Sequence, residues 1–324
     1  LTLYAFVRGS LSSRPGPWLV ASAAACLAGM GCKEVMVTAP VMVLLYDRTF
    51  VAGGFRAAWG RRWGYYLALA ATWLLLAWLV AGTGGRGGSA GFGIEVSSWE
   101  YLLTQCQAIV RYLGLVAWPH PLVFDYGTPL YRSFAAVAPQ AGLLLLLLGA
   151  TGWALLRKPA LGFLGAWFFL ILAPSSSIVP VATQTMAEHR MYLPLAAVLA
   201  LLGLAVHALA GRRALLVLLA LAAGAGVMTA RRNLVYHSEL ALWTDTVAHR
   251  PENPRAHTNL GIALAEAGRL DRVRRCAAEA GPIVGLDDVA RPEQAQTRAE
   301  SLSSCCRLSH HERREPGPRE RDGR

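Results

Sequence analysis

The sequence contains few charged residues for its length. Of its 324 residues, 16% are charged and 54% are hydrophobic, and the mean hydropathy is +0.38. Soluble domains usually contain about 25% charged residues. The deficit is confined to residues 1–230, whereas residues 231–324 hold much of the charge. This division excludes a single soluble domain and indicates a membrane-embedded part followed by a soluble part.

The sequence signatures of soluble enzymes are also absent. The chain contains no P-loop, no G-x-S-x-G, no H-E-x-x-H and no Rossmann glycine set, so a soluble nucleotide-binding site is not supported. Its six cysteines show neither C-x-x-C nor zinc-finger spacing. No other cluster of ligands has convincing metal spacing, so we assign no metal site and leave a role for a divalent metal open.

The net charge of +11 does not indicate nucleic-acid binding. No helix-turn-helix or RNA-binding aromatic motif accompanies it. The basic residues instead form short clusters between apolar runs, which is typical of helix ends anchored at the anionic cytoplasmic face of a membrane. These clusters are Arg61-Arg62, Arg157-Lys158, Arg212-Arg213 and Arg231-Arg232.

Apolar runs of roughly the length of a membrane span recur along the first 230 residues, since a spanning helix needs about 20 such residues. The expected spans are 63–82, 140–156, 160–173, 191–210 and 214–230. Stretch 18–46 is expected to form a hairpin of two short helices with its tip at 29–34. Residues 1–7 resemble the last turns of a helix that starts before Leu1. Counting the hairpin as two, about seven crossings are predicted.

The distribution of arginine and lysine predicts the orientation. With 48–62, 157–158 and 211–213 in the cytoplasm, the connection 174–190 and everything after 231 face outward, although Arg231-Arg232 goes against the rule. Parity then requires that 99–118 does not span. Its polar residues favour an interfacial or re-entrant helix, with a plain spanning helix as the alternative. We expect a multi-pass protein of the cell inner membrane.

The part after residue 231 has a different character. Leu240–His249 reads as a helix, and Asn253-Pro254 followed by Leu260, Gly261, Leu264 and Gly268 matches the first helix of a tetratricopeptide repeat. The second helix, 270–280, is a weak match, and 281–324 has the composition of a disordered tail. One repeat is not stable alone, so this end is hypothesised to be a truncated or frame-shifted part of a longer array. The expected domains are 1–232, 233–285 and 286–324.

Charged residues next to apolar runs are the first candidates for a site. Lys33 and Glu34 interrupt an apolar stretch at a cost of about 2.5–3.5 kcal/mol each on insertion scales. They either face a phosphate or an acceptor, or form a mutually paired structural break between two short helices.

The second candidate is the stretch before the span at 191–210, with Glu188, His189, Arg190 and Tyr192. An arginine fork suits a lipid phosphate, Glu188 could pair with it, and His189 could titrate or bind metal. The alternative is an ordinary helix start, with an acid near the positive end of the helix dipole and an arginine at the membrane interface.

Two further acids were considered. Asp125 could contact a sugar or a metal, but capping of a turn is the favoured role. Tyr46-Asp47 is interpreted as an anchor at the cytoplasmic interface.

Taken together, these residues resemble the transmembrane and tetratricopeptide-repeat proteins, over roughly residues 1–285. The stretch Glu188–Pro194 is the most specific part of the resemblance. The other motifs that carry it are Lys33-Glu34, Pro40, Leu44–Asp47, Pro119, Asp125-Tyr126, Pro174–Ser176 and the repeat. In eukaryotes this family is linked to protein O-mannosylation.

The resemblance implies an all-α polytopic bundle of the GT-C glycosyltransferase type. Such a protein moves a sugar, mannose being one candidate, from a polyprenyl-phosphate donor to a protein acceptor that the repeats bind on the outer face. Glu188, Arg190 and Tyr192 would lie beside the lipid phosphate. The family's acidic catalytic motif precedes the region that this sequence covers, so no catalytic residue is named and the chain alone is expected to be inactive.

Two other readings stay open. A non-catalytic, membrane-anchored repeat scaffold would share the same layout. A transporter would show an inverted internal repeat, which is not visible in the sequence.

Overall fold

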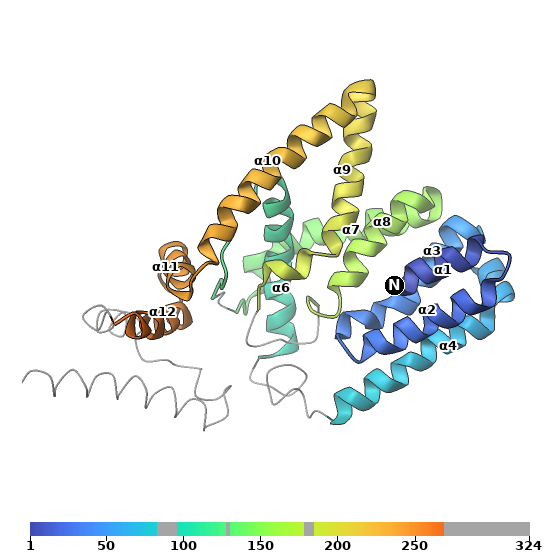
Figure 1. Cartoon of the computed structure of the whole chain (residues 1–324), viewed down its shortest axis with the longest axis horizontal. Coiled ribbons are helices and arrows are strands. Elements are labelled where there is room, and N and C mark those ends of the chain that lie inside the picture. The colour runs from blue at the N-terminus through green and yellow to red at the C-terminus, as the bar shows by residue number, and fades with distance from the viewer. Residues whose placement is uncertain (83–95, 128–129, 178–184, 269–324) are drawn as a thin grey trace, which may run out of the picture. The chain divides into compact units, whose positions relative to one another are not determined.

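The computed structural model describes residues 1–82, 96–127, 130–177 and 185–268, and these described residues form helices and connecting segments without any strand (Figure 1). The chain divides into two compact units. The first contains residues 1–122 and 128–227, and the second contains 123–127 together with the chain from Met228 onward.

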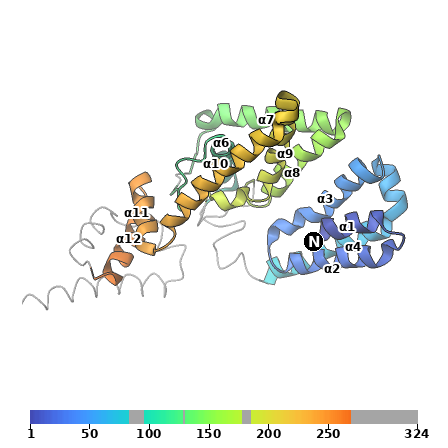
Figure 2. The ribbon, with the colours of Figure 1, turned by 45° about the horizontal axis from the view of Figure 1, so that its top comes forward.

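The first unit opens with a group of helices packed around one apolar core (Figure 2). The core includes Phe6, Cys26, Val43 and Leu69, each fully buried. Proline in the first turn of α2 and α3 suits a helix start, because its missing N–H has no intrahelical partner there. The elements are α1 (Thr2–Leu11), α2 (Pro15–Met30), the 3-10 helix η1 (Glu34–Thr38), α3 (Ala39–Tyr46), the π-helix η2 (Asp47–Val51) and α4 (Phe55–Gly82).

The remainder of the first unit contains the helices that surround the candidate site. Gly162 of α8 lies so close to the backbone of α7 that an added Cβ would stand 2.3 Å from the nitrogen of Leu155, so glycine is required for this close packing. The elements are α6 (Ser98–Ala117), η3 (Phe134–Val137), α7 (Ala138–Arg157), α8 (Pro159–Leu172), η4 (Glu188–Met191), α9 (Pro194–Ala210), η5 (Gly211–Arg213) and α10 (Ala214–Val235), which belongs to the second unit from Met228 onward.

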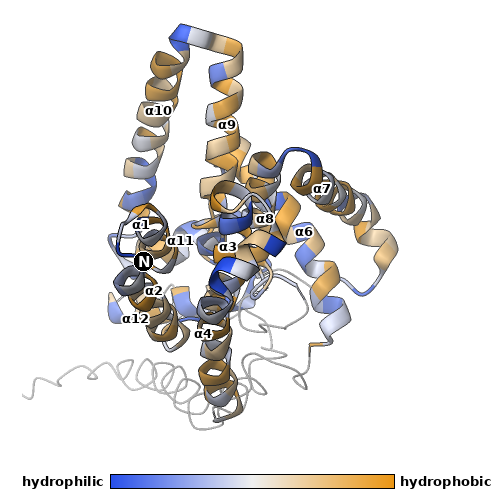
Figure 3. Cartoon of the chain, turned by 90° about the vertical axis from the view of Figure 1, so that its right-hand side faces the viewer, coloured by the Kyte–Doolittle hydropathy of each residue, from blue (hydrophilic) through white to orange (hydrophobic). Residues whose placement is uncertain are grey.

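Three stretches of the described residues are helical, long and apolar enough to cross a membrane: Phe55–Gly82, Phe134–Arg157 and Pro194–Val235. Only 11–17% of the most apolar window of each is buried inside the protein. A helix that is apolar on its outward faces suits lipid rather than water. In the third stretch the chain reverses at Gly211, whose φ is +52°, between α9 and α10 (Figure 3).

Each of the five predicted spans coincides with a helix, which confirms the prediction of helices there. α4, however, begins eight residues before the predicted start, within the predicted loop 48–62. The apolar window had excluded Arg61-Arg62, but Arg61 is exposed and Arg62 is paired with Asp47 at a kink, so α4 continues through both residues. α8 has 14 residues and reaches about 21 Å, less than the hydrocarbon core of a bilayer. The seven-crossing topology stays a prediction.

The predicted hairpin at 18–46 corresponds to α2 and α3 with Lys33 in the connection, but η1 intervenes between the two helices. The helix expected to end at 1–7 runs from Thr2 to Leu11. Segment 99–118 is α6, and it is not among the three candidate spans.

The second unit contains the helical pair α11 (Glu239–His249) and α12 (Pro254–Glu266). Trp243 of α11 packs against Ala256, Leu260 and Leu264 of α12. The two predicted helices of this region are thereby confirmed. The predicted second repeat helix 270–280 and the tail 281–324 lie outside the described residues, so the repeat assignment stays a prediction.

The loop 123–127 belongs to the core of this second unit. The ring of Phe124 lies edge-on to Trp243 at 5.3 Å, and the guanidinium of Arg250 lies 5.2 Å from the ring centre of Tyr126. Asn253 donates a hydrogen bond to the carbonyl oxygen of Asp125 at 3.1 Å. The loop is therefore held by the helical pair rather than by the helices on either side of it in sequence.

Candidate functional site

Helix α6 presents one polar, buried face. Ser97 caps the helix by accepting a hydrogen bond from the backbone N–H of Trp99. The buried side chains recur at intervals of three and four residues, which places them on one side of the helix. They include Tyr101, Thr104, Gln105, Ala108 and Tyr112. Most of these carry polar atoms, so this face binds another polar segment.

Arg190 of η4 connects this face to the segment that follows α8. One of its guanidinium nitrogens donates to the carbonyl oxygens of Ser175 at 2.9 Å and Thr185 at 3.3 Å, and to the hydroxyl oxygen of Tyr101 at 3.1 Å. The Tyr101 hydroxyl itself donates to the Ser175 carbonyl at 2.7 Å. Arg190 therefore has a structural role, and its positive charge stays fixed beside α6.

Two more side chains of α6 bind the same segment. Gln105 donates its amide N–H to the Thr185 carbonyl at 2.8 Å, and the Tyr112 oxygen accepts the backbone N–H of Ala187 at 2.7 Å. The side-chain amide oxygen of Gln105 and the hydroxyl of Ser176 are buried without a hydrogen-bond partner among the described residues. Buried polar atoms normally have partners, so these two leave capacity for a polar ligand or water.

The positive charge of Lys33 acts on His189 although the two residues are far apart in sequence. Burial lowers the pKa of His189 below its ordinary value of 6.5, and the positive charges of Arg190 and Lys33 lower it further. Lys33 is exposed, and its ammonium group makes no ion pair or hydrogen bond with any residue that the structure describes. Lys33, His189 and Arg190 form a group that we call the cationic cluster.

The other predicted site residues lie in different settings. Glu188 begins η4, and its charge acts on Tyr112, whose pKa is raised mainly by burial. Tyr192 is 82% exposed and points away from the protein. The side chain of Glu34 lies outside what the structure describes.

Asp125 is not part of the cationic cluster. Its carboxylate accepts the backbone N–H of Gly127 at 3.1 Å and lies 3.4 Å from the Nε of Arg255. The favoured role of capping a turn is therefore observed. The φ of Gly127 is +50°, and an added Cβ would stand 2.6 Å from the side chain of Asn253, so only glycine fits this turn.

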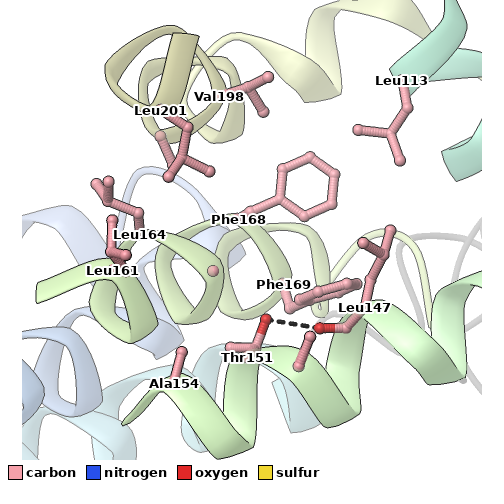
Figure 4. A pocket seen from close by; sticks show the side chains of 13 residues that line it. Leu113, Leu147, Thr151, Ala154, Leu161, Leu164, Phe168, Phe169, Val198 and Leu201 are labelled. Atoms are coloured by element: carbon pink, nitrogen blue, oxygen red, sulfur yellow. Dashed lines mark hydrogen bonds between the residues drawn. The ribbon is translucent and has the colours of Figure 1, made fainter. Parts of the chain in front are cut away.

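An apolar cavity of about 280 Å³ lies between α7, α8 and α9, with Leu113 of α6 at its edge (Figure 4). Phe169 of α8 lies beside Leu147 of α7, whereas Phe168 points toward Val198 and Leu113 (Figure 4). The Thr151 hydroxyl at the wall donates to the Leu147 carbonyl. Ala197 of α9, seven residues after Arg190 of η4, belongs to the lining. The cavity can hold a hydrocarbon chain but offers no polar recognition.

One buried polar group was misread from the sequence. Asp47, interpreted as an interfacial anchor, is fully buried. Both of its carboxylate oxygens accept hydrogen bonds from Arg62, at 2.9 and 2.8 Å, and the hydroxyl of Tyr66 donates to one of them. The anchor interpretation is wrong for Asp47, because the kink of α4 at Arg62 turns that guanidinium onto the π-helix.

Among the described residues no three histidine, cysteine or acidic side chains gather in a way that could hold a metal ion. No known protein family, no curated protein and no solved structure matches this chain.

Proposed function

We propose that this chain is the donor-binding part of a membrane glycosyltransferase of the GT-C type, which moves a sugar such as mannose from a polyprenyl phosphate to a protein acceptor. The observation that carries the proposal is that two members of the cationic cluster, His189 and Arg190, lie in η4 directly before α9, and α9 lines an apolar cavity. A lipid phosphate combines these two chemistries, an anion and a hydrocarbon chain.

The cluster favours a phosphate for electrostatic reasons. Arg190 is held by three protein oxygens, so its charge is already positioned before an anion arrives. Lys33 adds a compact charge on a flexible stem, which can follow a phosphate that moves from substrate to product. His189 is exposed and is affected by both of these charges, and a bound anion would favour its protonated form.

The roles in transfer follow from these positions. Charge accumulates on the departing phosphate as the bond between the sugar and the phosphate breaks, and Arg190 and Lys33 stabilise it. A carboxylate acts as general base on the acceptor hydroxyl. We assign that base to no residue of this chain. The protein would lie in the inner membrane of the cell. The pair α11 and α12 would contribute to acceptor binding on the non-cytoplasmic side of that membrane.

Binding of the donor lipid tests this proposal directly. The full chain in lipid nanodiscs is titrated with radiolabelled polyprenyl-phosphate mannose, and Lys33→Ala is compared with Lys158→Ala. These are the only two lysines of the sequence, and both are exposed, so the pair is matched for charge, size and environment. We expect Lys33→Ala to weaken binding about tenfold, as for the loss of one charge-assisted contact, and Lys158→Ala to leave it unchanged. Equal affinities in the wild type and both variants would contradict the proposal.

The alternative function is a membrane-anchored scaffold without catalysis. It is favoured by the independent core of the second unit, in which Trp243 and Leu260 are buried and the loop 123–127 is captured. A scaffold would bind protein ligands with the same affinity after Lys33→Ala and would show no binding of the donor lipid at all. The same titration therefore separates the two functions.

A further inference from the structure

The connection between α3 and α4 carries an arginine whose charge the protein leaves unbalanced. The guanidinium of Arg48 lies 5.3 Å from the ring centre of Phe55, and its NH1 nitrogen is buried without a hydrogen-bond partner among the described residues. Asp47 is the only acidic residue between Glu34 and Glu95. Because Arg62 and Tyr66 already occupy its carboxylate, Asp47 is not available to Arg48.

A second donor beside Arg48 is also unsatisfied. The hydroxyl of Thr49 is buried and has no partner among the described residues. A buried donor that lacks an acceptor costs the protein the hydrogen bond that it made with water. Both residues belong to the π-helix η2, and π-helical turns occur frequently at functional sites. The local structure therefore provides donors, one of them charged, without providing the anion.

The surroundings of Arg48 are those of a protein segment in a lipid headgroup region. Arg56 and Trp59 lie three residues apart on one face of α4, and Trp63 follows directly after the kink at Arg62. Phe55, Trp59 and Trp63 are each about half exposed, at 51%, 49% and 58%. Aromatic and basic side chains concentrate at the boundary between lipid and water, and basic residues there attract anionic lipids.

This surface is separate from the cationic cluster. The indole of Trp73 donates to the carbonyl of Val37 at 2.9 Å, and Arg62 binds Asp47. These two contacts show that the chain through η1, α3 and η2 runs antiparallel to α4. Lys33 and Arg48 consequently lie at opposite ends of this pair of segments.

We propose that the surface formed by Arg48, Thr49, Phe55, Arg56, Trp59 and Trp63 binds the phosphodiester headgroup of an anionic phospholipid. A phosphate oxygen that enters beside the ring of Phe55 would accept hydrogen bonds from the buried NH1 of Arg48 and the buried hydroxyl of Thr49, and the exposed rings lie along the glycerol and the first methylenes of the acyl chains. A lipid is favoured over a free phosphate because the surface is at the start of a helix long and apolar enough to span a membrane. The site is independent of the proposed transferase function.

The test measures lipid binding by the full chain in detergent, using native mass spectrometry with short-chain phosphatidylglycerol, short-chain phosphatidylcholine and inorganic phosphate as probes. We expect phosphatidylglycerol to bind best and inorganic phosphate not to bind. Arg48→Gln should weaken phosphatidylglycerol binding about five- to tenfold, and Arg48→Lys should have an intermediate effect. The matched control is Arg157→Gln, an exposed arginine at another helix end, which should change binding less than twofold.

The proposal is overturned if Arg48→Gln binds phosphatidylglycerol like the wild type, if Arg157→Gln weakens it equally, or if inorganic phosphate binds as well as the lipid. A folding defect is distinguished by a second variant, Thr49→Val, which removes one hydroxyl without changing charge or shape. Its lipid affinity should fall while its thermal unfolding midpoint in lipid-free detergent stays that of the wild type. An unchanged lipid affinity in a folded Thr49→Val protein would exclude Thr49 from the site and contradict the proposal.

Discussion

Replacing Arg62 by leucine provides a sharp test of the buried polar network in the first unit. Arg62 has 18% of its side chain exposed, whereas the Asp47 carboxylate has none. In the variant, Asp47 would keep only the hydrogen bond from Tyr66. A buried carboxylate that loses its cation destabilises a protein by about 3–5 kcal/mol.

A second route to the magnitude uses protonation. The variant can escape the buried charge by binding a proton, and neutralising an ordinary aspartate at pH 7 costs about 4 kcal/mol. This cost falls by about 1.4 kcal/mol for each unit that the pH is lowered. The two estimates agree, and together they predict that Arg62→Leu is strongly destabilised at pH 7 but approaches the wild type near pH 5.

The assay is reversible unfolding in mixed detergent micelles, followed by circular dichroism at pH 7 and pH 5. Arg61→Leu is the matched control, because Arg61 is the adjacent residue in the same helix and is exposed. The double variant Asp47→Leu, Arg62→Leu should recover much of the lost stability, since it removes the buried charge together with its partner. Equal stabilities of Arg62→Leu and Arg61→Leu at pH 7, or a deficit that does not shrink at pH 5, would refute the reasoning.

Three further outcomes are expected. A membrane-impermeant amine reagent should label Lys33 and Lys158 from opposite sides of sealed proteoliposomes, and labelling of both from one side would contradict the predicted topology. Binding of the lipid phosphate should strengthen as the pH falls from about 8 to about 5.5, because a bound anion raises the lowered pKa of His189 and the imidazole then takes up a proton. Binding to the His189→Gln variant should not depend on pH in this way. Gly127→Ala should destabilise the second unit by about 2–4 kcal/mol, because the φ of this residue is positive and the added Cβ clashes with Asn253. Gly268 has a similar φ but open space around it, so Gly268→Ala should cost only about 1 kcal/mol. Thermal unfolding of both variants measures the difference.

The positions of the long helices could be predicted from the sequence because long apolar runs have one stable arrangement in lipid. The ends of these helices were less predictable. The start of α4 at Phe55 and the π-helix at Asp47 depend on where Arg62 finds its carboxylate partner, and that partner lies outside any hydropathy window. Local pattern specifies an element, whereas its boundary depends on tertiary contacts.

The candidate site was predictable only where its residues are neighbours in sequence. Glu188, His189 and Arg190 are consecutive and polar beside an apolar helix, so they were recognisable. Lys33 is linked to them only by the effect of its charge on His189, which no linear pattern reveals. Gln105 of α6 was used only as an argument against a membrane span, and Tyr101 was not singled out, yet both side chains bind the segment that leads to His189 and Arg190.

Arg190 shows why a functional and a structural reading can both hold for one residue. Its guanidinium donates to three protein oxygens, so Arg190→Ala would release the segments around Ser175 and Thr185 as well as remove a charge. A loss of lipid binding in that variant would therefore fit either reading. The side chain of Lys33 is exposed, and its ammonium group bonds to no described residue. Its replacement therefore changes the local electrostatic field and little else. For this reason the assignment of the phosphate site depends on the comparison of Lys33 with Lys158 rather than on the more conspicuous arginine.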